Sequence, residues 1–87
     1  MTISFPNHSR SYDPRQHGVR FWGHDDACEV SFLVEDEALN QIDRTTQQTE
    51  EGFLVAFDGN RERIMTAASK AYSRRGNGFY ILAASSF

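Results

Sequence analysis

The sequence predicts an α+β fold, in which two helices pack mainly on one face of a small antiparallel sheet, in the order β-β-β-α-α-β. Three patterns predict it. Apolar and polar residues alternate between positions 19 and 34, which is typical of half-buried strands. Apolar residues recur at helical spacing between positions 49 and 74, and a last apolar stretch, 79–84, alternates again. The chain has 87 residues, enough for one hydrophobic core, so we expect a single domain over residues 1–87.

The N-terminal segment predicts two short extended pieces. Ile3 and Phe5 alternate with polar residues, which indicates a short strand that ends at Pro6. A loop then follows, and Tyr12 before it and Val19 after it are expected on the two arms of a hairpin.

The strongest local signal is a second hairpin, with its turn within residues 24–27. A loop of two or four residues keeps the apolar side chains on one face, and the pairing we expect sets Phe21 opposite Val30. A three-residue loop would set Phe21 opposite Glu29 and mix the two faces.

That alternation separates the residues that could bind a metal. Cys28 falls on the apolar face, where we expect it to be buried and inert. His24 falls on the opposite face with Arg20 and Trp22. Because a structural zinc site needs four converging ligands, we expect no metal and no cofactor.

Two helices are expected to follow. Residues 35–43 place acids ahead of apolar positions, which predicts a helix of about two turns. Thr49 is the expected N-cap of a main helix that runs to residue 74 and ends at the sequence Arg74-Arg75-Gly76-Asn77-Gly78.

The sequence Asp58-Gly59-Asn60 is turn-like and could split the main helix. However, the apolar phase continues from Phe57 to Ile64, so we expect one helix with Gly59 on its outer face. Asn60 then lies within the apolar stripe, where its amide is expected to bond the backbone of a neighbouring strand.

The last strand is apolar on both faces, which is typical of a central strand or of one whose second face is covered. One helix layer covers only one side of the sheet. The other side keeps Trp22 and Leu33, with Tyr80 and Leu82 or their alternates. Since monomers seldom expose large contiguous apolar patches, we expect this face to bind a partner, most simply as a two-fold homodimer. The alternative is that residues 1–12 fold across it.

Charge is distributed unevenly along the chain. The net charge is −3, but residues 25–51 hold nine acids against one arginine, which gives −8 between two mildly basic ends. This acidic middle is either a solvated surface or a patch for a basic partner. A net negative domain makes nucleic acid an unfavourable partner, because non-specific binding depends on many contacts from Lys and Arg to phosphate.

The sequence shows no catalytic motif. It lacks a phosphate-binding glycine loop and a nucleophile elbow, and its three histidines are spread over turns. It also lacks a long apolar run and a secretory leader, so we expect a cytoplasmic protein with no membrane association. These features favour a non-enzymatic binding or regulatory module. The alternatives are a nucleic-acid-binding accessory protein and a small enzyme with a site at an oligomer interface. The expected interaction surface is Arg20, Trp22, His24 and Tyr80, with Asn60 and Arg61 second.

Short segments in order along nearly the whole chain resemble the domain of unknown function 1488 family of small proteobacterial proteins. The resemblance implies a cytoplasmic bacterial α+β protein and transfers no activity, cofactor or catalytic residue. The matching segments are Ile3-Ser4-Phe5-Pro6-Asn7, Tyr12-Asp13, Val19-Arg20-Phe21-Trp22-Gly23, Val30-Ser31-Phe32, Ala38-Leu39, Phe57-Asp58 with Asn60-Arg61, Ile64, and Ala67-Ala68 before Tyr72.

Overall fold

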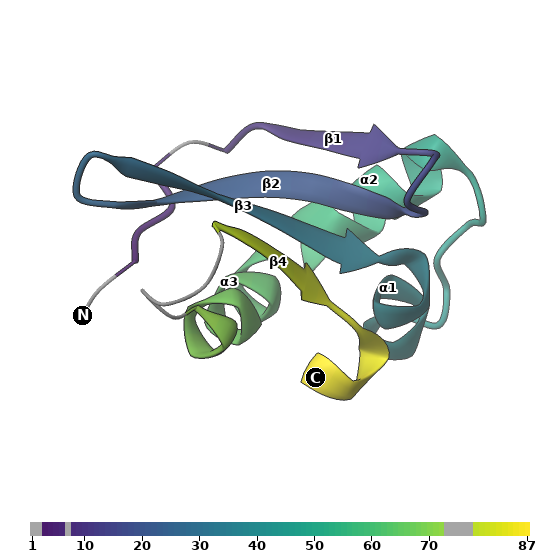
Figure 1. The fold of residues 1–87 in the computed structure, drawn as a ribbon. Coiled ribbons are helices and arrows are strands. Elements are labelled where there is room, and N and C mark those ends of the chain that lie inside the picture. Colours follow the sequence, from purple (N-terminus) through teal and green to yellow (C-terminus); the bar gives the residue numbers. More distant parts are fainter. Residues whose placement is uncertain (1–2, 7, 73–77) are drawn as a thin grey trace.

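In the computed structural model, which describes residues 3–6, 8–72 and 78–87, a sheet forms one layer and the helices form the other (Figure 1). The described strands pair in the order β1-β2-β3-β4. The α+β class and the order of strands and helices are confirmed. The elements are β1 Arg10–Asp13, β2 Gly18–Asp25, β3 Cys28–Glu35, α1 Asp36–Ile42, α2 Glu50–Gly59, α3 Arg61–Ala71, β4 Phe79–Leu82 and the short 3-10 helix η1 Ala84–Ser86.

The β2–β3 hairpin turns through two residues, Asp26 and Ala27, and pairs Phe21 with Phe32. The expected pairing of Phe21 with Val30 is therefore wrong by two positions, although the even loop kept every side chain on its expected face. Asp26 takes a φ of 55°, a left-handed conformation that aspartate tolerates in tight turns.

Cys28 is exposed, so the expectation that it is buried is wrong. It lies on the helix-side face, as the alternation required, but in the exposed tip of the hairpin, residues 26–29.

The N-terminal segment adds to the core on the helix side. Ser4 forms a single bridge with His24 instead of the expected strand, through backbone bonds of 2.9 and 2.8 Å. The Phe5 ring packs 5.7 Å from the ring of Phe32, over a gap left by Gly23, whose Cβ would lie 2.8 Å from Phe5. The alternative in which residues 1–12 fold across the other face is therefore wrong for the described part of this segment. Tyr12 and Val19 lie on the two arms of the β1–β2 hairpin, as expected, and they pair with each other.

The sheet is mixed rather than antiparallel, because β4 runs parallel to β3 at the edge of the sheet. The expectation of a wholly antiparallel sheet is therefore wrong, and of the two positions considered for the last strand the central one is excluded. The chain leaves β3 through helices that pack on one face, and such a crossover returns the next strand parallel to the first.

Along the chain between β3 and β4, α1 lies within the range 35–43 expected for the first helix. The expected main helix, however, is two helices that meet at Asn60. Asn60 has φ −123° and ψ 21°, outside the helical region, and its side-chain amide donates to the carbonyl of Ala56 at 2.9 Å. The hydrogen-bond partner expected for the Asn60 amide, the backbone of a neighbouring strand, is therefore wrong. Thr49 is confirmed as an N-cap, since its hydroxyl accepts from the Gly52 N–H at 3.0 Å. α3 ends at Ala71, so the expected end at residue 74 is wrong, and most of the cap expected at residues 74–78 lies outside the described residues.

The core lies between the helix-side face of the sheet and the three helices. The Phe21 ring stacks on Phe32 at 5.2 Å and meets the tilted ring of Phe57 at 5.1 Å. The buried core side chains are Val19, Phe21, Val30, Phe32, Val34, Ala38, Leu39, Phe53, Ala56, Phe57, Ile64, Ala67, Ala68 and Leu82. Among the described helices, none has the length and apolar character needed to span a membrane.

Candidate interaction surface

The face of the sheet opposite the helices carries the first three residues expected on the interaction surface. Alternation along β2 places Arg20, Trp22 and His24 there, and none of them packs in the core. We call this the open face. The register adds neighbours from the other strands, so that the open face consists of Ser11, Asp13, Gly18, Arg20, Trp22, His24, Glu29, Ser31, Leu33, Glu35, Phe79 and Ile81.

Phe79 and Ile81 replace Tyr80 on this surface. The parallel register sets Phe79 beside Ser31 and Ile81 beside Leu33, and Ile81 is 50% exposed. Tyr80 lies on the helix side, where its ring stacks 5.5 Å from Phe32. The expected surface residue was therefore wrong by one position, which in a strand is a change of face.

Arg20 organises the centre of the open face. Its guanidinium carbon lies 5.6 Å from the centroid of the Phe79 ring, which is within the range of a cation–π contact. The same guanidinium pairs with the Asp13 carboxylate at 3.6 Å. Arg20 therefore joins β1 to β4 across the two central strands.

Leu33 needs no partner molecule to be buried. It is 1% exposed, and its Cγ would lie 2.9 Å from a Cβ placed on Gly18, so it fills the space above that glycine. The expectation that Leu33 belongs to an exposed apolar patch is therefore wrong. The accessible apolar part of the open face consists of Trp22, Phe79 and Ile81.

Charged residues lie at both ends of the open face. Asp13 and Glu35 flank Gly18 at one end, and His24 lies opposite Glu29 at the other. Burial disfavours the charged form of Asp13, but hydrogen bonds from Gln16 and Arg15 and the charge of Arg20 outweigh it and lower its pKa. An apolar centre with polar margins is the usual anatomy of a protein interface.

Asn60 and Arg61, the second pair expected on the surface, lie instead at the junction of α2 and α3. Arg61 donates to the carbonyl of His8 at 3.0 Å and to Asp58 at 3.2 Å, with its guanidinium 4.9 Å from the Phe57 centroid. Arg10 forms a two-pronged pair with the same Asp58 carboxylate at 3.0 and 2.8 Å. The hydrogen bond from Arg10 is the largest influence on the pKa of Asp58 and lowers it; burial comes next and opposes it, but the charge of Arg10 and the contact with Arg61 add to the lowering. These contacts hold the N-terminal segment to the helices.

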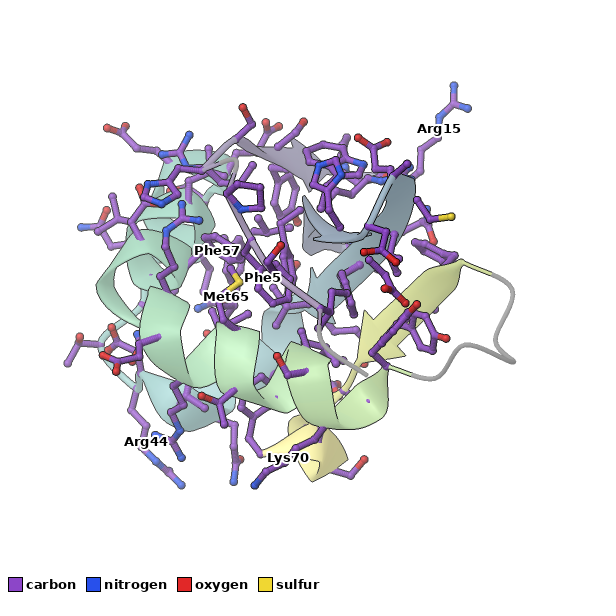
Figure 2. The ribbon with its side chains drawn as sticks, turned by 90° about the vertical axis from the view of Figure 1, so that its left-hand side faces the viewer. Phe5, Arg15, Arg44, Phe57, Met65 and Lys70 are labelled. Carbon is purple, nitrogen blue, oxygen red and sulfur yellow. The ribbon has the colours of Figure 1, made fainter. Side chains whose placement is uncertain are left out.

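A surface groove of about 610 Å³ runs beside this cluster, between the N-terminal segment and α3. Phe5 and Met65, both labelled in Figure 2, form its apolar wall. Among the charged groups that line it, Asp58 and Arg61 already bind each other, which leaves Glu62. The groove therefore shows no charged pair free to select a ligand.

His24 and Asp25 are neighbours in the sequence and could together serve acid–base chemistry, but their side chains do not converge. His24 faces outward, whereas Asp25 faces the helix side, where its carboxylate accepts a hydrogen bond from Tyr72. Within the described ranges, no group of three or more His, Cys, Asp and Glu side chains could hold a metal ion.

These features define a class of protein: a small α+β domain whose mixed sheet has helices on one face and an open second face. The chain belongs to the DUF1488 family, described as a protein of unknown function, whose model matches residues 3–82. Its fold is similar to the crystal structure of a protein of unknown function from the DUF1488 family of Shewanella loihica PV-4. That similarity has a TM-score of 0.78 at 17% identity and covers 94% of each chain, which shows a shared fold. Among curated proteins, none matches the chain.

Proposed function

We propose that this chain is a small, non-enzymatic binding module that acts through protein–protein contacts made by the open face. The observation that carries the proposal is the position of Trp22, Phe79 and Ile81 on one face of the sheet, outside the core. The same monomer buries Leu33 almost completely beside them, yet leaves Ile81 half exposed. Burying one aromatic ring removes about 150–250 Å² from water, so a partner that covers these side chains gains binding energy.

A protein partner fits this face better than a nucleic acid. Trp22 and Phe79 could stack on bases, but Asp13, Glu29 and Glu35 surround them and would repel phosphates. Arg20, the one arginine of the described open face, already pairs with Asp13. An absence of any gel shift with mixed RNA and DNA at about 50 mM salt supports this choice, and a salt-sensitive shift contradicts it.

We further propose that the protein works in the bacterial cytoplasm. Cys28 is exposed and is the single cysteine of the chain, so it has no internal partner. An exposed free thiol is suited to a reducing compartment, because in an oxidising one it would form disulfides between molecules.

Site-specific photo-crosslinking tests the proposed function. A photoreactive benzoylphenylalanine replaces Ile81, on the open face, or Val55, which is 63% exposed on α2. After irradiation in the bacterial cytoplasm, position 81 is expected to give protein adducts of defined mass and position 55 none. No adduct at position 81, equal adducts at both positions, or an adduct with nucleic acid alone would overturn the proposal.

A further inference from the structure

We infer that the partner of the open face is a second copy of this chain, packed face to face about a two-fold axis that lies across the strands. The inference rests on the proposed function, because it names the occupant of the same surface. In this arrangement Arg20 of one copy lies over the partner's Trp22, and Phe79 lies against the partner's Ile81.

The rows of side chains across the sheet lead to this arrangement. One central row holds Trp22 and Phe79, and the next holds Arg20, Leu33 and Ile81. A two-fold axis across the strands between these rows exchanges them and keeps each strand over its own copy. The Arg20 guanidinium of each copy therefore lies over the partner's Trp22 indole, and each Phe79 ring lies against the partner's Ile81. Both contacts occur twice by symmetry, which is the self-complementarity that a two-fold interface requires.

The other in-plane axis, along the strands, gives a poorer match. It would lay β4 of one copy over β1 of its partner, so that Ile81 would face Ser11 instead of an apolar side chain. It would, however, set His24 over the partner's Glu29 and Glu35 over the partner's Gly18. The axis across the strands sets Glu35 over the partner's Glu29 and His24 over the partner's Gly18, which leaves two pairs of like charge. Apolar contact, rather than charge, therefore favours the axis across the strands.

The size of the face sets the expected strength. Its strands contain 8, 8, 4 and 4 residues. At about 3.3 Å per residue and 4.8 Å between strands, they present about 400 Å² of flat area. Specific interfaces bury about 800 Å² of accessible surface per partner, about twice this flat area, so the dimer falls below the standard range and in the class of weak, transient contacts. We therefore expect reversible association with a dissociation constant in the micromolar range.

Analytical ultracentrifugation of the full chain between about 1 µM and 1 mM tests the inference. The sedimentation coefficient is expected to rise with concentration from monomer to dimer. Ile81→Asp should raise the dissociation constant about 30-fold or more, as expected for a residue central to an interface. Val55→Asp, a matched change on the helix side, should leave it unchanged. Ile81→Thr keeps the β-branched shape of the edge strand and should weaken the dimer too, which separates a lost contact from a misfolded strand.

The contacts between the copies test the orientation. In a dimer of one ¹³C-labelled and one unlabelled copy, the Ile81 methyl groups should show intermolecular nuclear Overhauser effects to the partner's Phe79. Effects to the partner's Ser11 instead would overturn the proposed axis. A chain that stays monomeric at every concentration overturns the inference of a second copy. If photo-crosslinking at position 81 then captures a different protein, the proposed function survives, and if it captures none, both fail.

Discussion

Arg61 shows how a residue with a functional appearance in the sequence can have a structural role. Its guanidinium reaches the carbonyl of His8 and the carboxylate of Asp58, and it covers the ring of Phe57. Arg10 holds Asp58 from the other side. The sequence indicated an exposed basic residue, because nothing in the helical pattern shows that a segment more than fifty positions earlier returns to the same place.

Gly52 and Gly59 provide a matched test of packing in α2. A Cβ on Gly52 would lie 2.2 Å from the backbone oxygen of Gln47, whereas a Cβ on Gly59 has nothing within 4 Å. Gly52→Ala is therefore expected to destabilise the fold by about 2 kcal/mol or more, because backbone must move. Gly59→Ala should be neutral or stabilise by up to about 1 kcal/mol, because alanine favours the helix. Urea unfolding of both variants measures the two effects, and equal effects would contradict the packing at Gly52.

Tyr12 is the residue for which the structure predicts a defined pH dependence. Burial, followed by its hydrogen bond of 2.8 Å to Asp36 and by nearby carboxylates, raises its pKa to about 12. An unfolded tyrosine ionises near pH 10. The folded pKa is the higher one, so Tyr12 contributes stability fully below about pH 10 and loses it as the pH rises toward 12.

Absorbance near 295 nm should therefore show one ionisation step near pH 12 that is missing in Tyr12→Phe. Tyr12→Phe keeps the aromatic ring that stacks on Phe53, with 5.6 Å between the ring centroids in the native chain. The variant therefore removes the hydroxyl and leaves the ring packing in place. Its stability should fall less steeply than that of the native chain between about pH 10 and 12. A Tyr12 step near pH 10 would contradict the buried hydrogen bond.

At the scale of elements, the sequence predicted what depends on local alternation and missed what depends on long-range packing. The hairpin faces, the helix of residues 35–43 and the cap at Thr49 follow from neighbouring residues, and all three are confirmed. The parallel pairing of β4 depends instead on the path of the chain through the helices, which no local pattern reports.

The break between α2 and α3 was missed for a specific reason. Phe57 and Ile64 are seven residues apart, so both face the core whether or not the helix turns between them. The deciding interaction is the bond from the Asn60 amide to the carbonyl of Ala56, which stabilises a non-helical backbone at Asn60. A local motif of this kind competes with a regular helix and leaves the apolar period unchanged.

Asn60→Ala should therefore destabilise the fold by about 1 kcal/mol, the usual net value of one such hydrogen bond. Arg63→Ala, an exposed change in α3, should alter stability by less than about 0.5 kcal/mol. Thermal and urea unfolding compare the two variants. An Asn60 variant as stable as the native chain would show that the break does not depend on the amide.

At the scale of the whole molecule, the sequence correctly indicated more apolar residues than one helix layer covers, but it did not identify which remain accessible. Positions 79–82 are apolar on both alternations, so the pattern alone could not decide between Tyr80 and Phe79. The register decides it, and Gly18 lets the monomer bury Leu33 by itself. The accessible apolar surface is smaller than the sequence implied, and it is centred on Trp22, Phe79 and Ile81.

The fluorescence of Trp22 tests most directly that the open face is the contact surface between copies. Trp22 is the single tryptophan of the chain and lies on that face, so its emission reports the face alone. As the concentration rises through the association seen by sedimentation, the emission should shift to shorter wavelength and quenching by acrylamide should fall. Ile81→Asp should move both changes to a concentration about 30-fold higher or more. Association that leaves the emission and quenching of Trp22 unchanged would contradict the account, because the copies would then meet through another surface.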